Sequence, residues 1–198
     1  MSSLYKNLPI NDGDNNQYEM NGEILEHIYS RFDYITSKLS QVFIVRFDLH
    51  LPDGIPDPLS ENKKISEFFN ILIQKKLKRG GNAHKHVIYS WVREVEKIKK
   101  AHYHCWIAVD KHKLDKVGSL QNNTGLYGLM SSVWKEVGGS CLSIATGAVN
   151  GLRVTCQKEK ESAFYALSYL AKARGKGVKH NTKVRDYGGS RVNIKHTK

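Results

Sequence analysis

Two histidines in a short, largely apolar run have the right spacing to bind a metal ion. His102 and His104 lie in the run from residue 101 to residue 109, and successive side chains of a β-strand alternate between its two faces. The two imidazoles would then share one face with Trp106 and Ala108, roughly 6.6 Å apart along the strand, and could converge on one cation. The opposite face would carry Tyr103, Cys105, Ile107 and Val109.

A third ligand is needed, because two histidines rarely hold a divalent ion alone, and a carboxylate suits Mg²⁺ or Mn²⁺. Glu94, in the strand predicted over 86–95, would lie beside the imidazoles if it paired opposite His102 or His104. Glu96 has the same parity and is the alternative ligand. A register shifted by one residue would turn both glutamates away. The alternative for the histidines is a surface or partner-bonded pair without a metal.

Tyr165, Tyr169 and Lys172 would present two hydroxyls and an ammonium on one helix face. They stand at i, i+4 and i+7 of a segment with helical periodicity, predicted to span residues 159–174. A tyrosine with the ordinary pKa of about 10 is a weak nucleophile, so it needs a metal-polarised electrophile or a nearby cation such as Lys172. The combination suggests metal-assisted cutting of a DNA strand by tyrosine. The alternative is that both rings pack as core aromatics with their hydroxyls at the rim.

The rest of the chain predicts elements that could position these residues. Asn21 is expected to cap a helix, and Ser60 a second helix that Gly80-Gly81 ends. Segments 86–95 and 101–109 are predicted to form an antiparallel hairpin joined by the basic turn 96–100. This mixture of helices and strands places the chain in the α+β class, with an antiparallel sheet. Further predicted elements are a strand over 41–51, a helix over about 126–137 and a strand over 151–156.

The domain organisation is expected to be simple. Residues 1–20 are polar with little apolar periodicity and are predicted to be an N-terminal arm. Residues 21–198 are predicted to form one domain with a basic tail from Gly175, because 198 residues suffice for one core but hardly for two.

Charge and cysteine content narrow the class of partner and the compartment. The chain has 31 Lys and Arg against 19 Asp and Glu, a net charge of +12, which favours a polyanion such as nucleic acid over a merely solvated basic surface. Its three cysteines show no CxxC spacing, which argues against a disulfide framework and a cysteine-rich zinc site. We find no apolar segment of membrane-spanning length or signal region, and we expect a cytosolic protein.

The histidine and tyrosine motifs together resemble a known family. His102-Tyr103-His104 followed by Tyr165-x-x-x-Tyr169-x-x-Lys172 is similar to the HUH endonucleases that start rolling-circle replication, in particular the two-tyrosine phage and plasmid initiators. The strand 45–52, the Arg93-Glu94 pair and the tail 187–191 further resemble the replication proteins of filamentous phages (inoviruses) and their prophage relatives. The resemblance covers about residues 40–191, and Tyr187 departs from the Phe that is usual there.

This resemblance implies an RRM-like palm of antiparallel strands that holds a divalent cation, Mg²⁺ or Mn²⁺, with the tyrosine helix laid across it. His102, His104 and Glu94 would be metal ligands, and Lys172 an electrostatic helper. One of Tyr165 and Tyr169 would attack single-stranded or extruded origin DNA and form a 5′-phosphotyrosine bond, and the other would cut the regenerated origin. The free 3′-hydroxyl would serve a host polymerase, with a host helicase as a further partner, in the cytoplasm of a bacterial cell.

Several basic side chains are expected to contact DNA phosphates. The candidates are Arg46, Arg93, Lys99, Lys100, Arg174, Lys176 and Arg191. Two other functions stay open. One is a single-stranded nucleic-acid-binding module without chemistry, in which Trp91, Tyr103 and Trp106 stack on bases. The other is a single-tyrosine relative, a transposase or conjugative relaxase, in which only one of Tyr165 and Tyr169 reacts.

Overall fold

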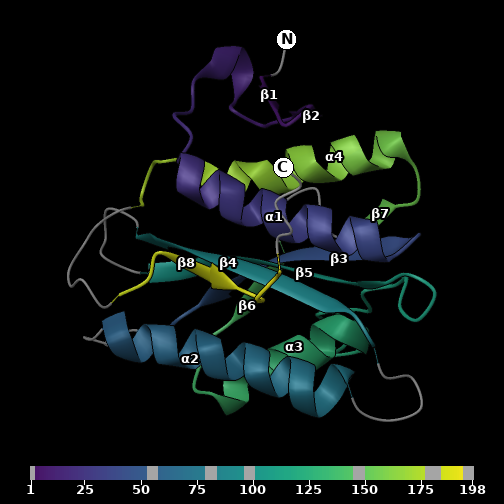
Figure 1. Ribbon diagram of the computed structural model, residues 1–198. Helices are drawn as coiled ribbons and strands as arrows, with labels where there is room; N and C mark the ends of the chain where they lie inside the picture. Colours follow the sequence, from purple (N-terminus) through teal and green to yellow (C-terminus); the bar gives the residue numbers. More distant parts are fainter. Residues whose placement is uncertain are drawn as a thin grey trace.

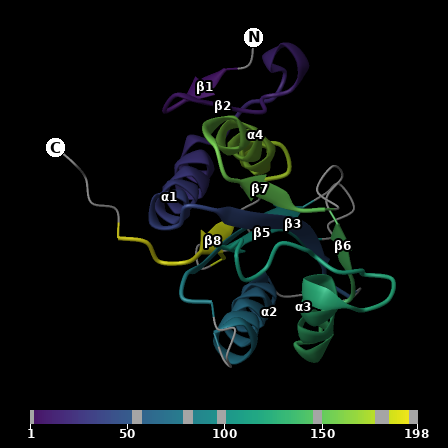
Figure 2. The ribbon, with the colours of Figure 1, turned by 90° about the vertical axis from the view of Figure 1, so that its right-hand side faces the viewer.

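The computed structural model describes residues 3–52, 58–78, 84–95, 101–144, 150–176 and 184–193. An antiparallel sheet lies between two layers of helices (Figure 1; Figure 2). Helices α1 (Gly22–Lys38) and α4 (Gln157–Ser168) cover one face. Helices α2 (Pro58–Asn70) and α3 (Gly125–Glu136) cover the other. The predicted α+β class is confirmed.

The three long strands of the sheet are the two arms of the predicted hairpin and their neighbour. From one edge to the other, the strands of the sheet are ordered β6-β3-β5-β4-β8. The short strand β7 pairs with the same edge of β3 as β6 does, but at the other end of β3. The strands are β3 (Val42–His50), β4 (Val87–Val95), β5 (Ala101–Asp110), β6 (Leu142–Ile144), β7 (Leu152–Val154) and β8 (Tyr187–Gly189). The turn between β4 and β5, with Glu96, Lys99 and Lys100, lies outside the described residues.

The predicted alternation of β5 is confirmed, and it separates two cores. Trp106 and Ala108 are buried with residues of α1 and α4, whereas Tyr103 and Ile107 are buried with residues of α2 and α3. Because His102 has the same parity as Trp106, the histidines belong to the α1 and α4 side of the sheet.

The helix boundaries agree with the sequence in part. Asn21 caps α1 as predicted, its side chain accepting a hydrogen bond from Ile24 N at 3.0 Å. Helix α2 already includes Pro58, so Ser60 lies within its first turn and is not its cap, and a π-helix, η2 (Ile71–Leu77), continues it. Helix α4 ends at Ser168 and not near residue 174.

The chain leaves α4 early because it pairs with the N-terminal segment. A 3₁₀ turn, η3 (Tyr169–Ala171), follows α4, and Lys172 then adopts an extended conformation and forms a β-bridge with Met20. Ala173 N donates to Glu19 O, and Asn21 N donates to Ala171 O, each at 2.7 Å. These backbone bonds replace those that a longer helix would make.

The N-terminal residues are part of the folded domain rather than a free arm. They form a small hairpin of β1 (Leu4–Tyr5) and β2 (Leu8–Pro9) and a 3₁₀ turn, η1 (Asp14–Asn16), above α4 (Figure 1). Leu8 and Ile10 are buried in the core that α1 and α4 share. Two apolar side chains separated by one residue are too short a signal to predict this packing from periodicity.

The tail also contributes to the sheet, because β8 pairs with β4. A Cβ on Gly188 would lie 2.5 Å from the Trp91 ring, so only glycine allows this approach. Across the described ranges, we find no helix long and apolar enough to cross a membrane. All three cysteines are free thiols.

Candidate metal centre and tyrosine segment

Glu94, His102 and His104 converge on one point of the α1 and α4 side of the sheet. Glu94 pairs directly opposite His102, the register that brings the glutamate beside the histidines. One ligand atom from each of the three lies within 4.8 Å of the others. His104 Nε2 is 3.1 Å from both His102 Nε2 and Glu94 Oε2. These separations suit neighbouring ligands of one cation held at roughly 2.1 Å, so the residues fit a divalent metal.

Asp48 orients one of the candidate ligands. It lies on β3 directly opposite His104, and its Oδ1 is 2.7 Å from His104 Nδ1. A carboxylate on Nδ1 favours the tautomer whose Nε2 lone pair faces the metal position, an arrangement common around metal-binding histidines. The sequence does not single out Asp48, although the alternation of side chains along β3 could have placed it on the same face of the sheet as the histidines.

Electrostatics favour an ionised carboxylate among the ligands. Burial opposes ionisation of Glu94, but its hydrogen bond to His104 and the charges of Lys176 and Lys172 lower its pKa to about 2. Burial and the neighbouring His104 lower the pKa of His102, which favours the neutral, metal-binding imidazole. Burial works against protonation of His104 as well, yet its bonds to Asp48 and Glu94 raise its pKa. Protonation of His104 would therefore compete with a metal for its Nε2.

Two lysines approach Glu94 from the segment after α4. Lys176 Nζ lies 3.3 Å from Glu94 Oε2 and Lys172 Nζ lies 3.7 Å from Oε1. The Lys176 side chain is 1% exposed, and this burial lowers its pKa to about 8. Gly175 makes the approach possible, because its φ is +76° and a Cβ there would lie 2.7 Å from Glu94 Cγ.

The two tyrosines occupy different environments. Lys172 Nζ donates to the Tyr169 hydroxyl at 3.0 Å, and the same ammonium contacts Glu94. The Tyr169 ring also lies against the Tyr18 ring, with centroids 5.9 Å apart. Tyr165, one turn earlier on α4, is 36% exposed, and among the described residues its hydroxyl makes no hydrogen bond. The predicted Lys172 contact is present, although it comes from an extended segment and not from a shared helix face.

Arg93 and Lys176, two of the predicted DNA-contacting residues, have their charges occupied inside the protein. Arg93 is 4% exposed and forms an ion pair with Glu61, NH2 to Oε2, at 2.8 Å. Arg93 faces the α2 side of the sheet, away from Glu94, and its burial there does not favour the predicted DNA contact. Lys176 forms an ion pair with Glu94, and its buried side chain likewise does not favour a surface contact with DNA.

The remaining DNA candidates divide into three groups. Arg46 is half-buried, donates to Ala166 O at 2.7 Å and lies near the Tyr169 ring. Arg174 and Arg191 are exposed. Lys99 and Lys100 lie outside the described residues, as does the alternative ligand Glu96.

The aromatic side chains that a binding module would use for stacking are part of the core. Trp91 is 4% exposed, and Tyr103 and Trp106 are completely buried. They are therefore not exposed to bases in this fold, and their burial does not favour stacking by these three rings.

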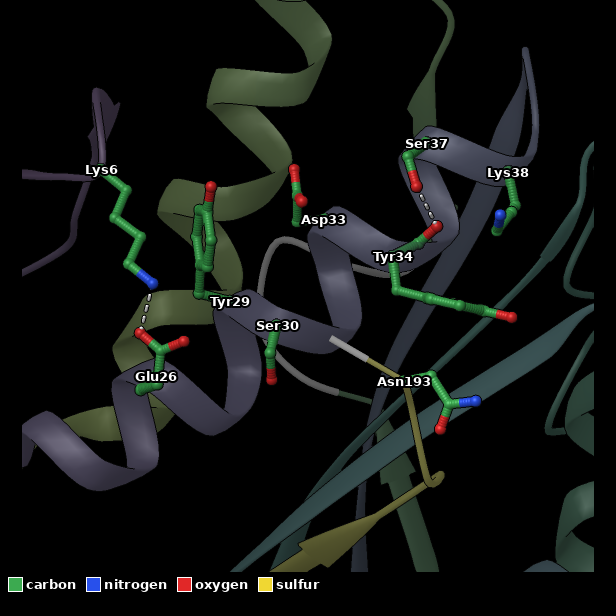
Figure 3. A pocket seen from close by; sticks show the side chains of 9 residues that line it. All are labelled: Lys6, Glu26, Tyr29, Ser30, Asp33, Tyr34, Ser37, Lys38 and Asn193. Atoms are coloured by element: carbon green, nitrogen blue, oxygen red, sulfur yellow. Dashed lines mark hydrogen bonds and ion pairs between the residues drawn. The ribbon is translucent and has the colours of Figure 1, made fainter. Parts of the chain in front are cut away.

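A separate hollow of about 440 Å³ lies over α1 (Figure 3). Lys6 and Glu26 form an ion pair across it, with Nζ and Oε2 2.6 Å apart. Its lining includes no residue of the histidine cluster and carries charges of both signs. It therefore adds nothing to the chemistry of the metal centre.

The fold and the cluster together define an α+β protein with a candidate metal centre on one face of its sheet. Residues 9–190 match the YagK/YfjJ C-terminal domain, and the chain belongs to this family of prophage-like proteins. No curated protein and no solved structure matches the chain significantly. The family agrees with the predicted link to prophages.

Proposed function

We propose that this protein is a metal-dependent, site-specific single-stranded DNA nickase and ligase of the HUH type that starts rolling-circle replication. The observation that carries the proposal is the convergence of Glu94, His102 and His104 beside a tyrosine, Tyr169, to which Lys172 connects them. The net charge of +12 fits a DNA partner, and the prophage-like family fits a replication protein of phage origin.

Each residue of the site has a role in this reaction. A bound Mg²⁺ or Mn²⁺ would polarise the scissile phosphate. Asp48 holds His104 in the ligating tautomer. Lys172, hydrogen bonded to the Tyr169 oxygen, stabilises the phenolate as its proton leaves to solvent.

The bond changes follow from this arrangement. The Tyr169 oxygen forms a bond to phosphorus, the bond from phosphorus to the 3′ oxygen breaks, and that oxygen takes up a proton. The products are a 5′-phosphotyrosine and a free 3′-hydroxyl. The reverse transfer, from phosphotyrosine to a 3′-hydroxyl, ligates the strand.

The different environments of the tyrosines support different roles for them. Tyr169 contacts the cluster lysine and is proposed to act first. Tyr165, exposed and one turn away, is proposed to carry out the second cut after a shift of the DNA or of α4. The same observation favours the single-tyrosine relative as the second candidate, because there Tyr169 alone would react.

The test is incubation with single-stranded filamentous-phage origin DNA and Mn²⁺, followed by a denaturing gel for a covalent adduct. We expect an adduct with the wild type, a strongly reduced one with Tyr169→Phe, and none with the double variant Tyr165→Phe/Tyr169→Phe. Tyr165→Phe should retain the first nick and lose circle release. If Tyr165→Phe completes both steps, the single-tyrosine function is correct. An adduct in the double variant, or in excess chelator, would reject the proposal.

A further inference from the structure

A hollow of about 410 Å³ opens beside the Tyr169 and Lys172 pair. Its volume lies in the range of roughly 300–1,000 Å³ that small-ligand sites occupy. Lys172 connects the hollow with the candidate metal centre, because it lines the hollow and its ammonium also contacts Tyr169 and Glu94. The hollow is lined by Gln17, Tyr18, Glu19, Lys172, Ala173 and Arg174.

Hydrogen bonds between two backbone segments hold its walls in place. Ala173 N donates to Glu19 O, the central residues Met20 and Lys172 form a β-bridge, and Tyr18 N donates to Asp12 O at 2.8 Å. The hollow is therefore built into the fold by the same pairing that ends α4 early.

The Tyr18 ring is held from two sides before any ligand arrives. It packs edge to face with Tyr169, at an interplanar angle of 78°. On another side it meets Gly13, where a Cβ would lie 2.7 Å from the ring. A ring fixed in this way loses little conformational freedom when a second ring stacks on it.

The lining has the chemistry of a nucleotide site. Lys172 and Arg174 are separated by one residue in the segment after α4, and Arg174 is exposed to solvent. Two cations beside an aromatic ring and the amide of Gln17 suit a base and its phosphate, because bases stack on aromatic side chains while Lys and Arg neutralise the backbone. Glu19 is the single acidic residue of the lining.

We infer that this hollow binds the nucleotide next to the scissile phosphate, with its base on Tyr18 and its outer phosphate on Arg174. The assignment rests on the proposed function, because it takes Tyr169 as the nucleophile. Lys172 then faces the scissile phosphate on one side and the bound nucleotide on the other. The site would set where on the strand the tyrosine attacks.

The test measures DNA binding separately from cleavage. Affinity for fluorescein-labelled oligo(dT) is measured by fluorescence anisotropy in chelator over a series of salt concentrations. Tyr18→Phe keeps the ring and should bind as the wild type does. Tyr18→Leu keeps apolar volume against Tyr169 but removes the stacking surface, and should weaken binding roughly 5- to 150-fold.

The charge arm uses Arg174→Gln and a matched control. This variant should lower the salt dependence of binding by about 0.7 in the log–log slope, the contribution of one phosphate contact on a single strand. Lys158→Gln removes an equal charge from the exposed start of α4 and should leave the slope unchanged. Tyr34→Leu, on α1, removes a ring outside this hollow and is the matched control for Tyr18→Leu.

Several outcomes would overturn the inference. Equal affinities of Tyr18→Leu and Tyr18→Phe would exclude stacking, and an unchanged slope for Arg174→Gln would exclude the phosphate contact. If Tyr18→Leu does not fold, as judged by circular dichroism, the salt dependence of binding by Arg174→Gln decides whether the hollow binds a nucleotide. Normal adduct formation with unchanged binding in these variants would reject the nucleotide site alone. Weakened binding in the variants, without any adduct in the wild type, would reject the nickase and keep a nucleotide site.

Discussion

Arg93 and Glu94 are neighbours on β4, yet they enter two very different polar clusters. Arg93 faces α2 and contacts Glu61 through two nitrogens, at 2.8 and 2.9 Å, with both side chains nearly inaccessible. Glu94 faces the other side and is shared among His104, Lys176 and Lys172 at 3.1, 3.3 and 3.7 Å.

The comparison teaches that burial alone does not identify a functional charge. The Glu61 carboxylate forms a short ion pair with two nitrogens of one guanidinium. Removing that guanidinium would leave the buried carboxylate charge without its partner. Glu94 has several longer contacts, and a cation arriving beside it could replace any one of them. The contacts of the first cluster suit stability, and those of the second suit the proposed exchange of a contact for a metal ion.

The largest expected effect separates the candidate ligand His102 from a close neighbour. His102→Ala should abolish Mn²⁺ binding and the DNA adduct, because it removes one of the converging donors. His50→Ala is the matched control, since its ring stacks on His102 with centroids 5.7 Å apart but is not in the cluster. Isothermal titration with Mn²⁺ measures both. Wild-type Mn²⁺ affinity in His102→Ala would contradict the proposed metal centre. Lost Mn²⁺ affinity in His50→Ala would add His50, on β3, to the metal centre.

The second prediction concerns the stability side of the comparison. Arg93→Met should lower the free energy of unfolding by about 3–5 kcal/mol, because Glu61 is left buried without its partner. The double variant Arg93→Met/Glu61→Met should recover much of this loss, while Mn²⁺ binding of the folded protein stays unchanged. Urea denaturation checks the first point and titration the second. A loss of metal binding in the folded double variant would show that the two clusters are coupled.

The third prediction is a pH dependence from Glu94. Its pKa is about 2 in the folded protein against an ordinary 4.5, so its contribution is complete above pH 4.5 and is lost as the pH falls toward 2. The contribution should be about 2–3 kcal/mol in the metal-free protein. The stability difference between wild type and Glu94→Gln should shrink over this pH range in urea denaturation. A difference that stays constant from pH 5 to 2 would show that the ion pairs of Glu94 do not stabilise the fold.

The smallest expected effect comes from Asp48, which acts through His104. Asp48→Asn should weaken Mn²⁺ binding roughly 10- to 100-fold, because the amide no longer selects the tautomer that presents Nε2. Asp110→Asn, at the other end of the same pair of strands, removes the same charge and should leave the affinity unchanged. Equal losses in the two variants would mean that general electrostatics, and not orientation, account for the effect of Asp48.

The sequence by itself determined what depends on local periodicity. The alternation of β5 placed both histidines on one face. The Asn21 cap and the hairpin of β4 and β5 followed from residues close together in the chain. The metal candidates were predictable for this reason. A strand of period two has only two faces, and an even pairing register then limited the third ligand to Glu94 or Glu96.

Only the tertiary structure decided the contacts between segments distant in the chain. The partner of Arg93 on α2, the orientation of His104 by Asp48 and the approach of Lys176 to Glu94 join residues 32, 56 and 82 positions apart. The early end of α4 is of the same kind, because backbone bonds to residues 19–21 compete with the helix. Local propensity carries no information about a partner dozens of residues away, so these contacts follow from packing.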